Sequence, residues 1–435
     1  MNHVYDPGRE VSAPEVPGIG DRAGPRTEGH VDGRQGRRPG GNGDHPLHEG
    51  FDDVDLERVS RRPGAKWALA DGGIAAWIAD MDFPPCPPVL SRLREIIEVG
   101  DLGYPNWLGR TPLRAAFSRR MAERHGWAAD AAPVREVTDL IQGVQLILHL
   151  ATAPGDAVAL HVPAYPPFLS SITASGRRLV PLPLHRDPTC GWALDPAATD
   201  DAVTRAGARV LILVNPHNPT GRVFTRAELE SVAETARRHD LLVISDEIHA
   251  DLGYTPHGHI PFASISPDAA RRTVTLTSAS KAFNLAGLRC AVMHVGDPDL
   301  LRKRDALPSD LFGAPSFLGV EAALAAWTPE GDAWLVTLVE HLGCNRRRVA
   351  EMAATWPGVD LAAPDGTYLA WLDVRGTGLG QWAGKAFAEG GVRLSPGEDF
   401  GPGGEGFVRL NFATSAGILD EALRRMDAVL RGTAA

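Results

Sequence analysis

The sequence is poor in cysteine, with four in 435 residues and no C-x-x-C pair among them. Cysteines spaced this far apart suggest neither a disulfide framework nor a zinc site. We therefore expect reduced, mostly structural thiols and no bound metal ion. The four are Cys86, Cys190, Cys290 and Cys344.

Long hydrophobic runs are also missing. No segment approaches the ~18 apolar residues of a membrane span, and the N-terminus has no apolar core of a signal peptide. The formal net charge of −10 is mild for this length and offers no basic surface for nucleic acid or an anionic membrane. These features predict a cytoplasmic protein without a nucleic-acid or membrane partner.

Apolar residues are scarce at the start of the chain. The stretch from Gly18 to Gly43 is rich in glycine, proline and arginine. Such a segment cannot bury enough surface to offset the entropy of ordering it. We expect residues 1–45 to form a disordered tail, and a role for it as a functional arm stays open.

Beyond the tail, apolar runs alternate with helical patterns. Because the runs are continuous rather than alternating, they predict strands covered on both faces, and so a mostly parallel sheet in an α/β domain. Between the third and fourth runs, Thr225 and Glu228 form the pattern of a capping box. The expected strands are Ala157–Val162, Leu179–Leu184, Val210–Val214, Leu241–Ser245, Thr273–Thr277 and Ala291–Val295.

Helices and strands follow a different order at the two ends of this region. Before it, Pro88–Val99 and the segment from Thr111 to Gly126 have helical patterns ended by glycine. After about residue 330, a smaller α+β domain is expected from a helix, a strand, another helix, a strand and a last helix. The bounded elements of that domain are Val336–Met352, Tyr368–Val374, Phe407–Phe412 and Ala416–Leu430.

Three polar clusters follow strands of the expected sheet, where open α/β sheets bind ligands. They are Asn215–Gly221, Ser245–His249 and Thr277–Arg289. Taken singly, the first could be a structural turn, the carboxylate of the second a helix cap, and Lys281 a surface lysine. In the third cluster, hydroxyls and Arg289 suit a phosphate, and a poorly solvated lysine becomes an amine nucleophile at neutral pH.

Together, the three clusters resemble the fold-type I enzymes that use pyridoxal 5′-phosphate (PLP), in the class I/II aminotransferase superfamily. The resemblance rests on Asn-Pro-x-Asn-Pro-Thr-Gly, then Asp-x-x-His, then Ser-x-Ser-Lys with Arg eight residues later. It implies the aspartate aminotransferase-like fold: a large domain over residues 96–329, and a small domain formed by residues 46–95 and 330–435.

Further segments, from about residue 50 to 430, look like the MalY/PatB group of cystathionine β-lyase-like C–S lyases. The segments weighed most are Ala79–Phe83 and Asp246–His249. The others are Lys66-Trp67, Gly103 to Trp107, Pro163–Tyr165, Gly366–Trp371 and Gly406–Asn411.

This resemblance implies roles around the cofactor ring. Lys281 would carry PLP as a Schiff base and then act as the base at Cα, and Asp246 would pair with the pyridine nitrogen. Asn218, with His249, would bind the phenolic oxygen, and Tyr165 would lie over the ring. Tyr165 and His249 could instead be packed core residues.

The resemblance also implies a phosphate site and a substrate site. Arg409 would bind the substrate carboxylate, and Asp80 and Trp107 would help form the substrate pocket. Tyr104 would reach the phosphate of a neighbouring subunit, so we expect a homodimer with shared active sites. The remaining phosphate groups would be the amides of Gly143 and Val144, where a helix over Leu146–Ala151 begins, with Ser278, Ser280 and Arg289.

The narrower resemblance favours α,β-elimination of cystathionine or another S-substituted cysteine. An aminotransferase that uses a 2-oxo acid is the alternative, because the same lysine, aspartate and arginine serve both reactions. A regulatory or ligand-sensing protein that keeps the fold is the alternative from another class.

Overall fold

The computed structural model describes residues 50–107, 111–308 and 311–432. The predicted disordered tail, residues 1–45, lies outside them. The described residues belong to one compact unit, so the bounds of the large and small domains stay a prediction. Within the described residues, no helix combines the length and apolar character of a membrane span.

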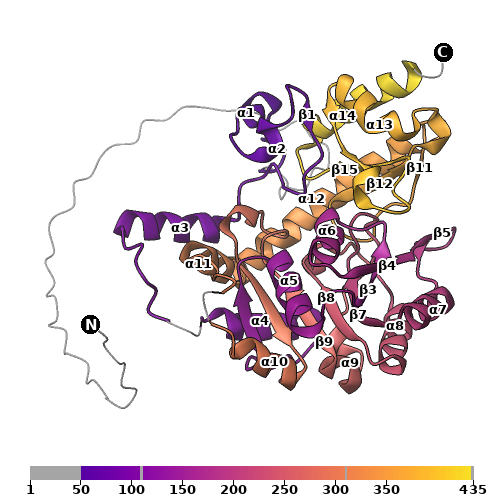
Figure 1. The fold of residues 1–435 in the computed structure, drawn as a ribbon. Coiled ribbons are helices and arrows are strands. Elements are labelled where there is room, and N and C mark those ends of the chain that lie inside the picture. The colour runs from indigo at the N-terminus through magenta and orange to yellow at the C-terminus, as the bar shows by residue number, and fades with distance from the viewer. Residues whose placement is uncertain (1–49, 108–110, 309–310, 433–435) are drawn as a thin grey trace, which may run out of the picture. The chain divides into compact units, whose positions relative to one another are not determined.

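A seven-stranded sheet forms the centre of the fold (Figure 1). All neighbouring strands from β9 through β8, β7 and β3 to β4 run parallel, and only β10 runs against them, between β2 and β9. This confirms the predicted mostly parallel sheet. In sheet order, the strands are β2 (Val134–Val137), β10 (Ala291–Val295), β9 (Thr273–Thr277), β8 (Leu242–Asp246), β7 (Ala208–Val214), β3 (Ala157–Val162) and β4 (Arg178–Pro183).

Helices cover both faces of this sheet, which explains the continuous apolar runs. In β3, Val158 and Leu160 belong to one apolar core and Ala157 and Ala159 to another. The first core includes α5 (Leu140–Ala151), α6 (Pro166–Ala174) and α10 (Pro298–Asp305). The second includes α7 (Pro196–Ala206), α8 (Arg226–Arg238) and α9 (Pro267–Arg271).

A four-stranded antiparallel sheet lies in the C-terminal part of the chain. The long helix α12 (Pro329–Ala353) contacts α3, α11, α14 and β11. The strands are β11 (Asp360–Leu361), β12 (Leu369–Asp373), β15 (Phe407–Asn411) and β14 (Ser395–Pro396). The helices are α3 (Pro87–Val99), α4 (Leu113–His125), α11 (Phe317–Ala326), α13 (Ala383–Glu389) and α14 (Ala416–Gly432).

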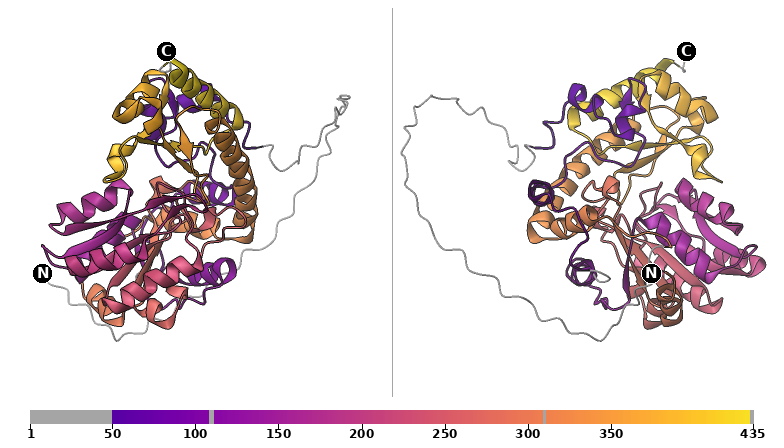
Figure 2. Two further views of the ribbon diagram at one scale, coloured as in Figure 1. Left: turned by 90° about the vertical axis from the view of Figure 1, so that its right-hand side faces the viewer. Right: turned by 60° about the vertical axis from the view of Figure 1, so that its left-hand side comes forward.

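The first and last described parts of the chain lie side by side, as both figures of the whole fold show (Figures 1 and 2). β1 (Ile74–Ala75) pairs in parallel with β13 (Val392–Arg393). The short helices α1 (Leu56–Ser60) and α2 (Ala65–Ala68) precede this pairing. Segments more than 300 residues apart in sequence therefore build one region of the fold.

Most predicted elements are observed, with shifted ends. Each of the six predicted sheet strands agrees within two residues, and α8 begins with the predicted capping box of Thr225 and Glu228. Two helix starts were wrong: α5 begins at Leu140 rather than Leu146, and α12 begins at Pro329 rather than Val336. Asp139 and Thr328 cap these earlier starts with their side chains. Not predicted were β2, the hairpin of β5 (His185–Asp187) and β6 (Gly191–Ala193), and the two-residue strands.

Candidate active site

A cavity of about 320 Å³ lies beyond the carboxyl ends of β7, β8 and β9, where β10 begins. The three polar clusters of the sequence meet here because parallel strands end at the same edge of a sheet. The lining residues used below are Asp80, Asp139, Leu140, Ile141, Tyr165, Asn218, Asp246, His249, Ser278, Ser280, Lys281 and Arg289.

Lys281 follows β9 and lies in the wall of the cavity. Its Nζ donates a 2.8 Å hydrogen bond to the Ala79 carbonyl, which also accepts one from the Tyr368 hydroxyl at 2.9 Å. Burial lowers the pKa of Lys281, and Asp80 opposes that shift. The amine is therefore positioned and easily deprotonated, as a nucleophile or proton carrier must be.

Asp246 is the last residue of β8 and is 4% exposed. Its Oδ1 accepts a 3.0 Å hydrogen bond from the Ile248 amide. Burial raises the pKa of Asp246 to about 7, with opposing contributions from that amide and from Lys281. A buried carboxylate is unstable in its charged form unless a cation pairs with it, and a protonated ring nitrogen would be such a cation.

Asn218 and Arg409 meet although 191 residues separate them. The Asn218 Oδ1 accepts a 2.9 Å hydrogen bond from Arg409 Nη1, so the side-chain amide of Asn218 is the group free to donate. Arg409 Nη2 donates to the Trp77 carbonyl and to Ser395 Oγ. Arg409 lies behind Asn218 rather than in the wall itself, and its buried Nε has no hydrogen-bond partner among the described residues.

His249 and Tyr165 both line the cavity. Burial lowers the pKa of His249 to about 3, helped by Lys281 and Arg409, so the imidazole is neutral at physiological pH. Its buried Nδ1 has no partner within the part of the chain that the structure describes. An unpaired buried polar atom is costly to stability.

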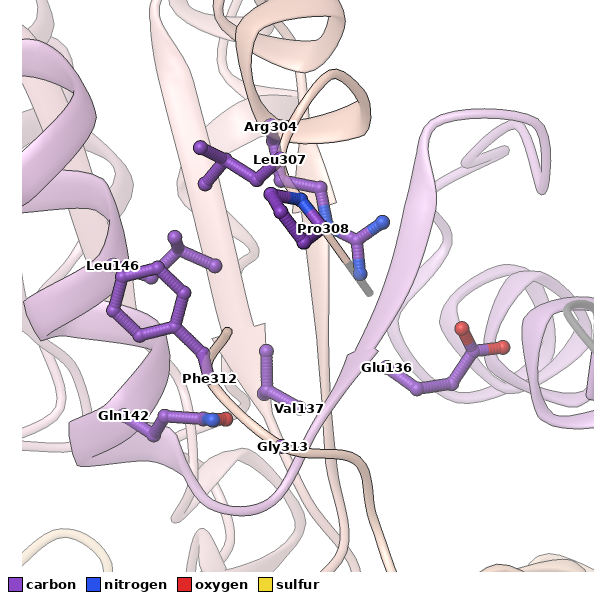
Figure 3. A pocket seen from close by; sticks show the side chains of 9 residues that line it. All are labelled: Glu136, Val137, Gln142, Leu146, Arg304, Leu307, Pro308, Phe312 and Gly313. Carbon is purple, nitrogen blue, oxygen red and sulfur yellow. The ribbon is translucent and has the colours of Figure 1, made fainter. Parts of the chain in front are cut away.

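Gly143 and Val144, whose amides were expected to bind phosphate, lie inside a helix and away from the cavity. Gly143 is inside α5, where its N–H bonds to the Asp139 carbonyl at 3.2 Å, and Val144 is fully buried. Neither lines the cavity, because the helix begins at Leu140; Leu140 and Ile141, in its first turn, line the cavity instead. The opposite side of this turn, with Gln142, faces a separate pocket of about 30 Å³ (Figure 3), room for a single water.

The other predicted phosphate groups do come together. Ser278 donates from its hydroxyl to the Cys290 carbonyl at 2.6 Å and accepts from the Ser280 amide at 3.0 Å. Arg289 forms an ion pair of 2.5 Å with Asp139 Oδ2. Asp139, which the sequence analysis did not select, is thus part of the same end of the cavity. Its signal was its position three residues before Gln142, the spacing of a helix cap.

Two further predicted residues, besides Gly143, Val144 and Arg409, do not line this cavity. Tyr104 is 95% exposed, and Trp107 packs on Phe317 with ring centroids 5.4 Å apart. Asp80 is in the cavity wall, as expected of a residue near the substrate.

Two asparagines that the sequence analysis gave no role fix the segment carrying Ala79 and Asp80. Asn284 exchanges hydrogen bonds with the backbone of Met81 and donates to the Phe83 carbonyl. Asn411 donates to the carbonyls of Ile78 and Asp80, both at 2.6 Å. Only the folded structure brings these residues together, so sequence spacing offered no signal.

Comparison with known proteins agrees with this arrangement. The profile of the aminotransferase class I and II family matches residues 78–426. The chain is 33% identical to cystathionine β-lyase PatB of Bacillus subtilis, covering 85% of this chain and 95% of that protein. It is also 33% identical to a cystathionine β-lyase of Corynebacterium glutamicum, covering 86% and 99%. The crystal structure of a PLP-bound C–S lyase from Staphylococcus hominis is similar, with a TM-score of 0.79, 27% identity, and coverage of 87% and 98%.

The cavity fits the cofactor of this family. A buried carboxylate, an amine of lowered pKa and a hydroxyl-rich end beside a helix start are the partners that a pyridine nitrogen, an aldehyde and a phosphate require. The chain belongs to the aminotransferase class I and II family of PLP-dependent enzymes, in the group of the cystathionine β-lyases.

Proposed function

We propose that this protein is a C–S β-lyase that converts cystathionine or another S-substituted cysteine to a thiol, pyruvate and ammonia. The observation that carries the proposal is the meeting of Lys281 and Asp246 in one cavity, with Arg409 directly behind its wall. Relatives named cystathionine β-lyase, aligned over nearly their whole length, support the choice of reaction.

Each end of the cavity suits a part of the cofactor. Asp246 would pair with the ring nitrogen, since opposite charges ~4 Å apart at an effective dielectric of ~20 attract by roughly 4 kcal/mol. The side-chain amide of Asn218 and the imidazole of His249 suit the phenolic oxygen, and Tyr165 suits the ring face. The phosphate would be held by Ser278, Ser280, Arg289 and the amides of Leu140 and Ile141 in the first turn of α5.

Residues of the chain bind the substrate and move its proton. Arg409 is buried directly behind the cavity wall with an unpaired Nε, and its guanidinium would bind the substrate carboxylate. Bound PLP withdraws electrons from Cα of the amino acid. Once the amine of the substrate has displaced Lys281 from the cofactor, its uncharged Nζ would accept the Cα proton. The same group would then deliver this proton to the departing sulfur. Hydrolysis of the remaining three-carbon fragment gives pyruvate and ammonia.

One assay tests this function against transamination. Purified protein is incubated with cystathionine or cystine and pyruvate is followed, and then the assay is repeated with a 2-oxo acid acceptor. Pyruvate without acceptor, lost in Lys281→Ala, is the expected result. Amino acid formation that requires the acceptor, with no elimination, would overturn the lyase proposal in favour of an aminotransferase. A protein that binds PLP and amino acids but turns over neither would instead be a ligand sensor.

The active unit we propose is a cytoplasmic homodimer with shared sites. Tyr104 supports this, because a tyrosine that is 95% exposed on one chain is available to a second. Nearby apolar side chains are exposed too, as expected where another surface packs. They are Ile97, Val99 and Leu102, which are 59–74% exposed.

A further inference from the structure

The phosphate end of the cavity already contains an anion. Asp139 Oδ2 lies 2.5 Å from Arg289 Nη2, and Asp139 Oδ1 accepts a 2.8 Å hydrogen bond from the Gln142 amide at the start of α5. Both charged residues line the cavity with Ser278 and Ser280. One carboxylate therefore occupies two groups that attract anions, a guanidinium and the N-terminus of a twelve-residue helix.

These two groups are also the ones that a phosphate would use. A phosphate monoester carries a charge of about −1.5 to −2 at neutral pH. Placed among Ser280, Arg289 and the amides of Leu140 and Ile141, it lies next to the Asp139 carboxylate. The Arg289 side chain is 64% exposed and so has room to turn from one anion toward the other, whereas Asp139 is fixed as the helix cap.

We propose that Asp139 weakens the hold on the cofactor, because its carboxylate competes with the phosphate of PLP for Arg289 and for the start of α5. This inference rests on the proposed PLP chemistry of the cavity. The charge at position 139 therefore lowers the affinity of the chain for PLP.

The test uses Asp139→Asn, which removes the charge and keeps an oxygen able to cap α5. Cofactor-free wild type and variant are titrated with PLP and with pyridoxal, which lacks the phosphate, and binding is followed by cofactor absorbance. We expect the dissociation constant for PLP to fall about fivefold to tenfold, and less so at high salt. The constant for pyridoxal should not change.

Two further variants make the result specific. Asp195→Asn neutralises another capping aspartate, exposed at the start of α7 and bonded to the Ala198 amide at 2.9 Å, and should leave PLP binding unchanged. Arg289→Gln should weaken PLP binding. If Asp139→Asn proves unstable, Asp139→Ser carries the same test, since serine also caps helices.

The outcomes separate the inference from the proposed function. Asp139→Asn binding PLP no more tightly than wild type, or tightening for pyridoxal as well, overturns the inference alone. Wild type that fails to bind PLP through Lys281 overturns both.

Discussion

The carboxyl group of Asp246 is buried, and its charged form lowers the free energy of unfolding when no cation faces it. Burial raises its pKa to about 7 in the folded chain, whereas an unfolded aspartate titrates near 3.9. As pH rises between these values, the unfolded chain releases a proton that the folded chain retains. Stability therefore falls with rising pH across this window and levels off above about pH 7.

The first prediction follows from this sign. In cofactor-free protein, we expect the unfolding midpoint of wild type to fall relative to that of Asp246→Asn as pH rises from about 4 to about 7. Asp240→Asn, which neutralises a side chain that is 98% exposed, controls for loss of one charge. A difference between wild type and Asp246→Asn that stays constant with pH contradicts the prediction. With PLP bound, the facing ring cation should abolish the fall.

Residue types and their order predicted which side chains would meet in the cavity. Asn218 and Lys281 follow parallel strands and Asp246 ends one, so the sheet alone brings the three side chains together. The positions of Gly143 and Val144 depended on where α5 begins, which the cap at Asp139 decides. The contact of Arg409 with Asn218 joins two sheets, and no local pattern encodes its geometry.

The loop after β7 carries Asn218. At the end of this loop, its backbone packs closely against a segment of the C-terminal region. Gly221 has φ +71°, and a Cβ there would lie 3.0 Å from Pro364 Cα and 3.1 Å from the Gly366 carbonyl oxygen. Its own carbonyl accepts a hydrogen bond from the Gly366 amide. Loop and C-terminal segment therefore fit together only around glycine.

The second prediction compares two glycines of similar backbone conformation. Gly72, with φ +79°, has open space where a Cβ would be. Alanine at either site should cost about 1 kcal/mol for its positive φ, and Gly221→Ala about 2 kcal/mol more because of the clash. Denaturant unfolding measures both. We also expect Gly221→Ala, but not Gly72→Ala, to disturb Asn218 and alter the absorbance of bound cofactor. Equal losses at the two sites would mean that Pro364 moves aside without cost.

Strands buried on both faces were the elements best predicted from sequence. In such a strand the buried run of residues begins and ends with the strand itself, so the sequence predicts both strand ends. In β3, for example, all six residues are buried. The missed hairpin strand β5 has exposed or half-buried residues throughout, so hydrophobicity gives it no boundary. Two-residue strands such as β14 exist only through their pairing with β15.

At the scale of the whole molecule, the shared-site dimer can be tested by mixing subunits. If Tyr104 serves the partner's phosphate site, a hybrid of Tyr104→Ala and Lys281→Ala subunits has one site that carries both changes and one intact site. After the two variants are unfolded together and refolded, activity should exceed the mean of the separate variants. Self-contained sites would give that mean.

A matched mixture controls for refolding. Lys281→Ala and Asp246→Asn alter the same cavity of one chain, so every site of their hybrid lacks one of the two groups. No gain is expected there. A gain in this mixture would show that exchange of subunits, rather than sharing of sites, restores activity.

The cavity wall beside Lys281 is formed in part by residues 78–80, and hydrogen bonds from residues some 330 positions later in the chain hold this segment in place. Arg409 and Asn411, in β15, bind the carbonyls of Trp77, Ile78 and Asp80. A chain that lacks β15 still contains every strand of the parallel sheet, but it lacks the hydrogen bonds that hold this wall in place. We therefore expect a chain terminated just before β15 to keep Lys281 but to lack the hydrogen bonds that complete the substrate site.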